Sequence, residues 1–304
     1  QKGKRVLVRV DFNVPIKNGK VKDDFKIKKS LSTIEYLIKM KAKIILVSHL
    51  GRPDGMEKKE LSLAPVKKYL EKILRQKIKF YKLNELNKIK NALIANCEIA
   101  MLENIRFSPD EKKDIGTFAR DLASIGDIFI IDGFAVAHRP AASVSGIAKY
   151  LPTYAGLLLE KELAGLTKVI AKPKKPFIVI LGGVKMETKI PVLEKLLPLA
   201  DHILVGGGIV NTYLSAKGNQ IGVSLVDKEF KKQALLYGAE KKVIMPIDVL
   251  IGKENGSEAQ VLLISEVRKL KSEVGIYDIG PATIRLFAKY IKNANTLVWN
   301  GAMG

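Results

Sequence analysis

The sequence predicts an α/β protein of two domains, each a mainly parallel β-sheet flanked by helices. Short apolar runs rich in Val and Ile alternate along the chain with segments whose apolar residues recur every three or four positions. Continuous apolar runs are typical of strands buried on both faces, and strands that alternate with helices form parallel sheets. The length of 304 residues is compatible with two domains of ordinary size.

The first half of the chain contains five predicted strands. They cover residues 5–10, 43–48, 77–81, 98–102 and 127–132. Between them, segments 29–41 and 64–75 have the apolar spacing of amphipathic helices. We predict that these elements form one domain over residues 1–156.

The second half repeats this alternation after a connecting segment. Its predicted strands cover residues 177–182, 202–206, 242–247 and 296–300. Residues 157–172 form a predicted amphipathic helix, and the Pro-Lys-Lys-Pro sequence at 173–176 ends it because proline lacks a backbone donor. We therefore predict a connecting helix and hinge over residues 157–175 and a second domain over residues 176–304.

The composition limits the classes of partner. The formal charge of +21 is compatible with nucleic acid, a membrane surface or a small anion. The lysines are scattered singly or in pairs and aromatic residues make up only 7%, which disfavours nucleic acid. No apolar run approaches the roughly 20 residues that span a bilayer, and no leader is visible. The single cysteine, Cys97, predicts a reducing, cytoplasmic environment.

Polar side chains follow four predicted strands of the first half. They are Asp11 and Asn13, His49 and Arg52, Arg106, and His138 and Arg139. Ligands of parallel α/β sheets bind at the carboxyl ends of the strands, and arginine grips carboxylates and phosphates through paired hydrogen bonds. Each residue alone is more commonly a surface or capping residue. Together they indicate a site for a small, multiply anionic substrate that carries hydroxyl groups.

Glycine and lysine follow the strands of the second half. The motifs are Gly182-Gly183 with Lys185, Gly206-Gly207-Gly208, and Asn300-Gly301. Glycine lets backbone amides approach a phosphate, and Lys185 and Lys189 share a helix face because they are four residues apart. Neither a Walker A loop nor a GxGxxG fingerprint is present, so each motif alone is weak. The combination indicates a nucleotide site, and hence phosphoryl transfer between ligands of the two domains.

Several longer motifs, taken together, resemble the phosphoglycerate kinase family over the whole chain. They are RVDFNVP at 9–15, SHLGRP at 48–53, LENIRF at 102–107, AHR at 137–139, ILGGVK at 180–185, GGG at 206–208, DIGP at 278–281 and VWNG at 298–301. The resemblance implies two Rossmann-like domains joined by a hinge helix. It also implies reversible transfer of the 1-phosphoryl group of 1,3-bisphosphoglycerate to MgADP, which gives 3-phosphoglycerate and ATP. A monomeric, cytoplasmic, glycolytic enzyme that uses Mg²⁺ with its nucleotide is expected.

The resemblance also assigns roles to individual residues. The triose-phosphate site would consist of Asp11, Asn13, Lys26, His49, Arg52, Arg106 and Arg139. The nucleotide site would consist of Gly183, Lys185, Lys189, Gly207, Gly208, Asn300 and Gly301. Lys26 and Lys185 would be catalytic, since Lys185 would neutralise the phosphoryl group in transfer. No metal ligand is expected within these 304 residues.

The chain departs from the family pattern at several positions. Lys26, Thr188, Ile131, Ala141 and Ala302 stand where the family has Arg, Asp, Asn, His and Pro. By the same resemblance, the sequence stops before the family's ribose-binding glutamate and its magnesium-binding Gly-Gly-Gly-Asp loop. We therefore expect an incomplete C-terminal domain and little or no activity from the 304 residues alone. A degenerate relative that binds anion or nucleotide without turnover stays open, as does a basic nucleic-acid binder, which only the charge favours.

Overall fold

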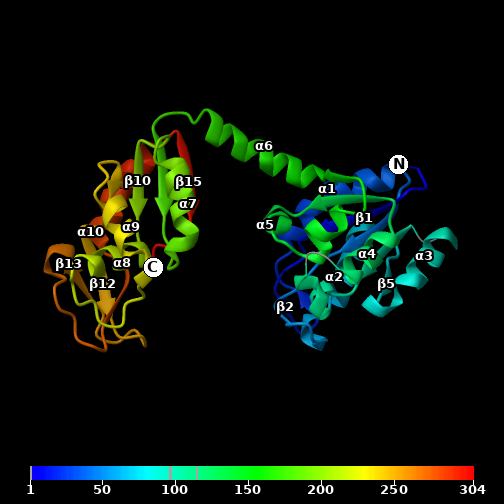
Figure 1. Cartoon of the computed structure of the whole chain (residues 1–304), viewed down its shortest axis with the longest axis horizontal. Coiled ribbons are helices and arrows are strands. Elements are labelled where there is room, and N and C mark those ends of the chain that lie inside the picture. Colours follow the sequence, from blue (N-terminus) through cyan, green and yellow to red (C-terminus); the bar gives the residue numbers. More distant parts are fainter. Residues whose placement is uncertain (1, 96–97, 114–115) are drawn as a thin grey trace. The chain divides into compact units, whose positions relative to one another are not determined.

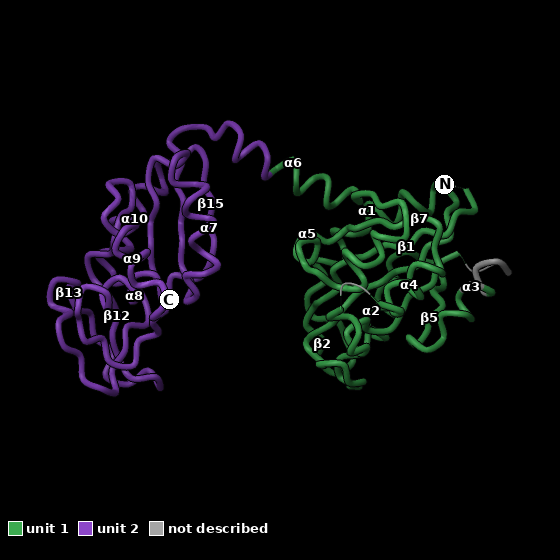
Figure 2. The backbone as a smooth tube through the Cα atoms, in the orientation of Figure 1, with its two compact units in different colours: residues 1–165 green, residues 166–304 purple. Residues whose placement is uncertain are grey.

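The computed structural model describes residues 2–95, 98–113 and 116–304, so Cys97 lies outside the described residues. The chain forms two compact units, Gln1–Gly165 and Leu166–Gly304 (Figure 2). The division between them falls inside helix α6 (Leu157–Ala171), within the segment 157–175 expected to connect two domains. The hinge role of that segment stays a prediction.

Unit 1, whose strands β1 and β5 are labelled in Figure 1, is built on a six-stranded, all-parallel sheet with the strand order β5-β6-β4-β1-β7-β8. Its strands are β1 (Arg5–Val10), β4 (Lys43–Val47), β5 (Lys79–Tyr81), β6 (Ile99–Leu102), β7 (Ile128–Asp132) and β8 (Thr153–Ala155). The five predicted strands are confirmed; the bounds of β1 are those predicted, and the other four differ by one or two residues at an end. β8 is the additional edge strand, and its three residues are exposed.

Helices cover both faces of this sheet. They are α1 (Phe25–Lys39), α2 (Ala64–Leu74), α3 (Leu86–Ala95), α4 (Thr117–Ser124) and the short α5 (Phe134–Ala137). Val6 and Val8 of β1 belong to one apolar cluster with residues of α1 and α2, whereas Leu7 belongs to a second cluster with residues of α3 and α4. Alternate side chains of a strand point to opposite faces, so both faces of β1 are buried. Helix α1 begins at Phe25 rather than residue 29, because Ile27 already packs in the core.

The connections of unit 1 contain several short elements. A hairpin of β2 (Ile16–Lys17) and β3 (Lys20–Val21) turns through Asn18 and Gly19, both with positive φ. Three-residue and four-residue 3₁₀ helices follow: η1 (Lys59–Leu61), η2 (Leu83–Glu85), η3 (Ile105–Phe107) and η4 (Pro109–Lys112). A π-helical turn, η5 (Ala142–Gly146), lies after α5. The last two elements, η4 and η5, contribute buried polar side chains to the site described below.

Unit 2 contains a four-stranded parallel sheet with the order β11-β10-β9-β15. Its strands are β9 (Phe177–Leu181), β10 (His202–Val205), β11 (Val243–Ile244) and β15 (Thr296–Asn300), and its helices are α7 (Met186–Leu196), α8 (Gly208–Ala216), α9 (Lys231–Gly238) and α10 (Pro281–Lys292). Alternate residues of β9 again pack into two clusters, one with α7 and α8 and the other with Phe287 of α10. The α/β class and the parallel, helix-covered sheets are therefore confirmed in both units.

A small antiparallel sheet in unit 2 was not predicted. It consists of β12 (Asp248–Gly252), β13 (Gln260–Leu263) and β14 (Gly275–Ile279) in the order β13-β12-β14. The predicted strand 242–247 is reduced to the two residues of β11, because Pro246 and the start of β12 follow at once. Two 3₁₀ helices, η6 (Lys228–Phe230) and η7 (Ile264–Glu266), complete the unit. None of the helices in the described ranges is both long and apolar enough to cross a membrane.

Candidate functional site

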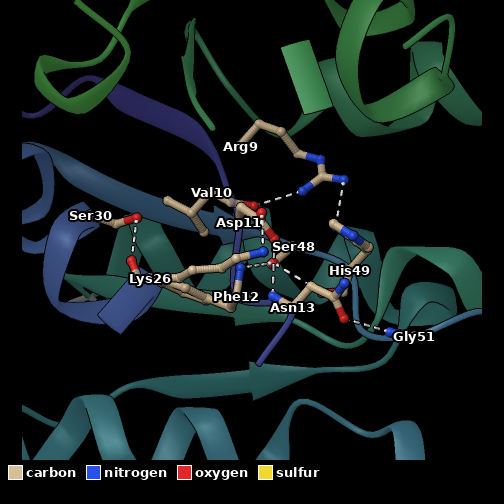
Figure 3. Close-up of polar contacts among 10 residues, drawn as sticks. All are labelled: Arg9, Val10, Asp11, Phe12, Asn13, Lys26, Ser30, Ser48, His49 and Gly51. Carbon is tan, nitrogen blue, oxygen red and sulfur yellow. Dashed lines mark hydrogen bonds and ion pairs between the residues drawn. The ribbon is translucent and has the colours of Figure 1, made fainter. Parts of the chain in front are cut away.

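The segment after β1 places two polar side chains around a buried anchor. Phe12 is fully buried, and its N–H donates to Ser48 Oγ at 2.9 Å, which joins the ends of β1 and β4. On either side of Phe12, Asp11 and Asn13 point toward Lys26 and Gly51 (Figure 3). Lys26 Nζ of α1 donates to Asp11 Oδ2 at 2.8 Å, and the Asn13 N–H donates to Asp11 Oδ1 at 3.1 Å. Because Phe12 is anchored in the core, the polar residues before and after it, Asp11 and Asn13, are held at the carboxyl end of the sheet.

The turn after β4 is tied to this segment and to the turn after β6. The Gly51 N–H donates to Asn13 Oδ1 at 3.0 Å, and Arg106 Nη1 donates to the Gly51 carbonyl at 2.7 Å. Gly51 has φ +60°, and a Cβ there would lie 2.7 Å from Leu61 Cδ2. A side chain at position 51 would be strained by the positive φ and would require the end of Leu61 to move.

Asn104 is a structural residue of the site that sequence reasoning missed. It is fully buried, and its Oδ1 accepts from the N–H groups of Leu50 and Arg106 at 3.2 and 3.1 Å. Its Nδ2 donates to the Leu50 carbonyl at 2.7 Å. Asn104 therefore fixes the backbone of Arg106 relative to the turn after β4.

The predicted arginines line one pocket of about 610 Å³ on unit 1. Its lining includes Arg52, Arg106, Arg139 and His138, together with Arg9, Glu111 and Ala141. Asp11, Asn13, Lys26 and His49 do not line this pocket; they lie in the adjoining network of Figure 3. Arg9 joins the two groups, because it lines the pocket and contacts His49 at 3.3 Å. The structure thus brings all seven predicted substrate residues to one region of unit 1.

Arg9 is the main site residue that the sequence analysis did not single out. Only 2% of it is exposed, and its Nη1 donates to the Val10 carbonyl at 2.7 Å. Burial lowers the pKa of Arg9 to about 10, so it stays cationic at neutral pH. An arginine in the interior of a strand that is buried on both faces was a signal in the sequence, since such a charge requires partners.

The electrostatics of this region favour anions. Burial, followed by the charges of Arg9, Arg106 and Arg139, lowers the pKa of His49 to about 2, so this imidazole is neutral. Burial and the nearby charge of Arg139 also lower the pKa of Arg106. A phosphate or carboxylate that enters among such cations is attracted by their charges.

The glycine motifs of unit 2 pack against one another at the carboxyl ends of β9, β10 and β15. Gly183, Gly207 and Gly301 all have positive φ. A Cβ on Gly208 would lie 2.7 Å from Val184 Cα, and one on Gly301 would overlap the carbonyl oxygen of Gly182. The three turns therefore approach backbone to backbone, which larger residues would prevent.

Lys185, Lys189 and Asn300 lie at the same edge. Lys185 precedes the first residue of α7, and its carbonyl accepts from Thr188 Oγ1 at 3.0 Å. Lys189 Nζ donates to Asn300 Oδ1, and burial lowers the pKa of Lys189. Helices α7 and α8 both begin here, so their N-terminal N–H groups and dipoles add attraction for anions. All seven predicted nucleotide residues are thus gathered at one edge of the parallel sheet of unit 2.

The described residues contain no built metal centre. Across residues 2–95, 98–113 and 116–304, no group of three His, Cys, Asp or Glu side chains is placed to hold a metal ion.

The fold and the two clusters are typical of the class of α/β proteins that act on phosphorylated small molecules. The family model described as phosphoglycerate kinase matches residues 1–304. The phosphoglycerate kinase of Pelotomaculum thermopropionicum is 41% identical over 312 residues, which cover 100% of this chain and 79% of the relative. That of Moorella thermoacetica is 42% identical over 310 residues, covering 99% and 78%.

Solved structures agree. Phosphoglycerate kinase from Coxiella burnetii has a TM-score of 0.77 and 38% identity, with 100% of this chain and 78% of that chain covered. The enzyme from Pyrococcus horikoshii has a TM-score of 0.82 and 29% identity, with 100% and 79% covered. The chain belongs to the phosphoglycerate kinase family, and its class of activity is that of a phosphotransferase.

Proposed function

We propose that the chain catalyses reversible transfer of the 1-phosphoryl group of 1,3-bisphosphoglycerate to MgADP, giving 3-phosphoglycerate and ATP. Membership of the family supports the reaction class. The observation that carries the proposal is the pocket of unit 1, where Arg9, Arg52, Arg106 and Arg139 surround one cavity. Four arginines around one cavity suit a small substrate with more than one anionic group.

Each cluster receives a role in this proposal. The pocket arginines hold the distal phosphate, and Asp11, Asn13 and His49 contact the hydroxyl and carboxyl end of the triose. Lys26 stabilises the acyl phosphate as the bond between phosphorus and the carboxyl oxygen breaks. Catalysis of phosphoryl transfer requires positioning of the reactants and stabilisation of charge rather than a covalent bond to the protein, and these cations supply both.

The nucleotide is assigned to unit 2. Backbone N–H groups of the glycine turns and the N-termini of α7 and α8 receive its phosphates, and Lys185 and Lys189 add positive charge. Mg²⁺ enters bound to those phosphates, as part of the substrate. A β-phosphate oxygen of ADP attacks the acyl phosphate, and the carboxylate of 3-phosphoglycerate leaves. The substrates must meet for this step, and we assign the hinge that permits it to residues 157–175.

Replacing pocket arginines tests the proposal. A charged hydrogen bond contributes roughly 1.5–3 kcal/mol, so Arg52→Ala and Arg106→Ala should each weaken 3-phosphoglycerate binding roughly 10- to 150-fold. MgADP binding should not change, because these residues lie in unit 1. Arg120→Ala is the matched control, since this exposed arginine of α4 does not line the pocket. Unaltered 3-phosphoglycerate binding in both variants would reject the assigned pocket.

One observation favours a second candidate, a relative that binds its ligands without turnover. Lys26 stands where the family resemblance implies arginine, and Asp11 already pairs with it at 2.8 Å. A coupled assay for ATP formation, run beside calorimetry of both substrates, separates the candidates. Binding of 3-phosphoglycerate and MgADP without any transfer would support the non-catalytic alternative. A nucleic-acid binder would instead show affinity for oligonucleotides that falls steeply with salt.

The cellular setting belongs to the same proposal. We infer a monomeric, cytoplasmic enzyme of glycolysis from the family alone. Analytical ultracentrifugation and fractionation of the source cells test these two points separately from the catalytic assay.

A further inference from the structure

A buried chain of hydrogen bonds runs behind the pocket of unit 1. It connects Glu111 of η4, Ser143 of η5, Arg9 of β1 and His49, which follows β4 by two residues. Their exposed fractions are 5%, 0%, 2% and 3%. A buried donor or acceptor that loses its partner cannot form a hydrogen bond to water instead. A change at one residue of the chain therefore affects the next, and the direction of each bond from donor to acceptor matters.

The contact between Arg9 and His49 fixes where the imidazole proton lies. Arg9 Nη2 is 3.3 Å from His49 Nδ1 (Figure 3). A guanidinium group can only donate hydrogen bonds, so His49 Nδ1 must be the acceptor. A neutral imidazole with an accepting Nδ1 carries its proton on Nε2. A cationic imidazole would place two N–H groups against each other.

The other end of the chain is directional as well. Arg9 Nε donates to Ser143 Oγ at 2.9 Å, so the hydroxyl proton is free to point elsewhere. Ser143 Oγ donates it to Glu111 Oε1 at 2.5 Å, and the Ser143 N–H donates to Glu111 Oε2 at 3.0 Å. The carboxylate of Glu111 thus ends a chain in which the Arg9 Nε proton and the Ser143 hydroxyl proton each have an acceptor.

The charges that lower the pKa of His49 are positive and belong to Arg9 of β1, Lys26 of α1, Arg106 of η3 and Arg139, which follows α5. Two carboxylates lie in the same network, but Asp11 pairs with Lys26 at 2.8 Å and Glu111 accepts from Ser143. Adding a proton to His49 would therefore place a fifth cation among four. Within the described ranges, Nε2 makes no hydrogen bond, so it is the end of the chain that a ligand can meet.

We propose that Glu111 and Ser143 are positioning residues that act through Arg9 to hold His49 as the neutral tautomer protonated at Nε2. In this state His49 offers the substrate one N–H donor and no base or positive charge. This inference rests on the proposed function, because the contact between His49 and the triose is part of that proposal. An N–H donor suits a carboxylate or hydroxyl oxygen of a three-carbon acid, whereas the opposite tautomer would present a lone pair to an anion and repel it.

Nitrogen-15 NMR of the imidazole rings tests the tautomer in the unaltered protein. The chain has three histidines, and His49→Gln identifies the signals of His49. We expect an unprotonated Nδ1 and a protonated Nε2 that do not titrate between roughly pH 5 and pH 8, where an ordinary histidine changes charge. A titrating His49, or one protonated at Nδ1, would overturn the proposal. The spectrum needs no substrate, so its outcome is separate from whether the chain turns over.

Substitutions at Ser143 and Glu111 test whether the chain of hydrogen bonds from Glu111 to His49, here called the relay, controls the His49 tautomer. In Ser143→Ala the link is lost, and in Glu111→Gln the amide can donate to Ser143 Oγ and reverse its hydroxyl. We expect both to release His49 into a mixture of tautomers and to weaken 3-phosphoglycerate binding by about tenfold, the effect of about 1.4 kcal/mol. Binding of MgADP should not change.

Ser30→Ala is the matched control, because Ser30 is equally buried but bonds only the Lys26 carbonyl, at 3.3 Å. It should leave the His49 spectrum as it is. Folded Ser143→Ala and Glu111→Gln proteins with an unchanged His49 spectrum would refute the relay. Should neither variant fold, fast solvent exchange of the Arg9 Nε proton in the unaltered protein would refute it equally, since that proton is assigned to Ser143.

Discussion

At the scale of single residues, Lys26 is the proposed catalytic residue at a position where the family resemblance implies arginine. Its ammonium group pairs with Asp11 at 2.8 Å while 44% of the Lys26 side chain stays exposed. An ammonium group acts as a point charge, whereas a guanidinium group could hold Asp11 and a phosphoryl oxygen at once.

We therefore expect Lys26→Arg to raise kcat. One further hydrogen bond in the transition state, worth about 1 kcal/mol, corresponds to a gain of about fivefold. Lys28→Arg on the same helix is the control, since Lys28 pairs with Asp24 at the surface. Steady-state kinetics in the direction of ATP formation decides the matter. An unchanged kcat in Lys26→Arg would contradict the contact between residue 26 and the transferred group, and a lower kcat would contradict the advantage expected of the guanidinium group.

The sequence was informative about site residues that directly follow an apolar run. Arg52 and Arg106 could be predicted because parallel strands present such residues at one edge of the sheet. Arg9 was harder, since it lies within a strand. Glu111 and Ser143 had no local signal at all. They are 32 residues apart, and Ser143 meets Arg9 across 134 positions, so their role exists only in the folded unit.

At the scale of elements, the first turn of α8 depends on the closeness of two glycine turns. A Cβ on Gly208 would lie 2.7 Å from the Cα and 3.0 Å from the carbonyl oxygen of Val184. Backbone cannot move aside as the end of a flexible side chain can. We expect Gly208→Ala to separate the turns after β9 and β10, to lower the free energy of unfolding by roughly 1–3 kcal/mol, and to weaken MgADP binding.

Gly165→Ala is the control for stability. Gly165 lies in α6 with open space around its Cα, so alanine should stabilise the helix by up to about 1 kcal/mol. Urea denaturation of both variants measures the effects. If Gly208→Ala were as stable as the unaltered protein and bound MgADP equally well, the turns would not be in the contact described.

Asp132 at the end of β7 holds the start of α6. Its Oδ1 accepts from the N–H groups of Leu158 and Leu159 at 3.0 and 3.4 Å, while Thr33 Oγ1 accepts from that of Leu157 at 3.0 Å. The Asp132 side chain is fully buried, and its Oδ2 has no partner among the described residues. Burial raises the pKa of Asp132 from 3.8 to about 6 despite these hydrogen bonds.

This pKa sets the sign of a pH dependence. Because the folded pKa lies above the unfolded one, the contribution of Asp132 to stability is fully present below pH 3.8 and is lost as pH rises through about 6. The loss amounts to about 3 kcal/mol for a shift of this size. Asp132→Asn keeps an acceptor for α6 without a charge. We expect the unaltered protein to lose stability relative to Asp132→Asn between pH 4 and pH 7. A difference that stays constant across that range would contradict the assignment.

The strands that could be predicted from the sequence are those that are buried on both faces. β1, β4 and β9 were found because most of their residues are apolar and nearly all are buried. β13 was not found, because three of its four residues are exposed and its pattern differs little from that of a loop. Its pairing with β12 is a tertiary contact that local periodicity does not report.

At the scale of the whole molecule, each unit has its own hydrophobic core. Two of the apolar clusters draw their described residues only from unit 1, and the other two draw theirs only from unit 2. The proposed triose-phosphate residues lie in the first unit and the proposed nucleotide residues in the second. A ligand stabilises only the structure it binds, so each substrate should protect one unit.

Hydrogen exchange read by mass spectrometry tests this expectation. At about 100 times its dissociation constant a ligand adds about 2.7 kcal/mol, which slows amides that exchange through unfolding about 100-fold. With 3-phosphoglycerate alone, we expect slowing in the buried strands β1 and β4 and none in β9 and β10. With MgADP alone the pattern should reverse, because its contacts begin at the glycine turns after β9 and β10. Equal protection of both units by either substrate would mean that the two cores do not unfold separately, and the assignment of one substrate to each unit would then need another basis.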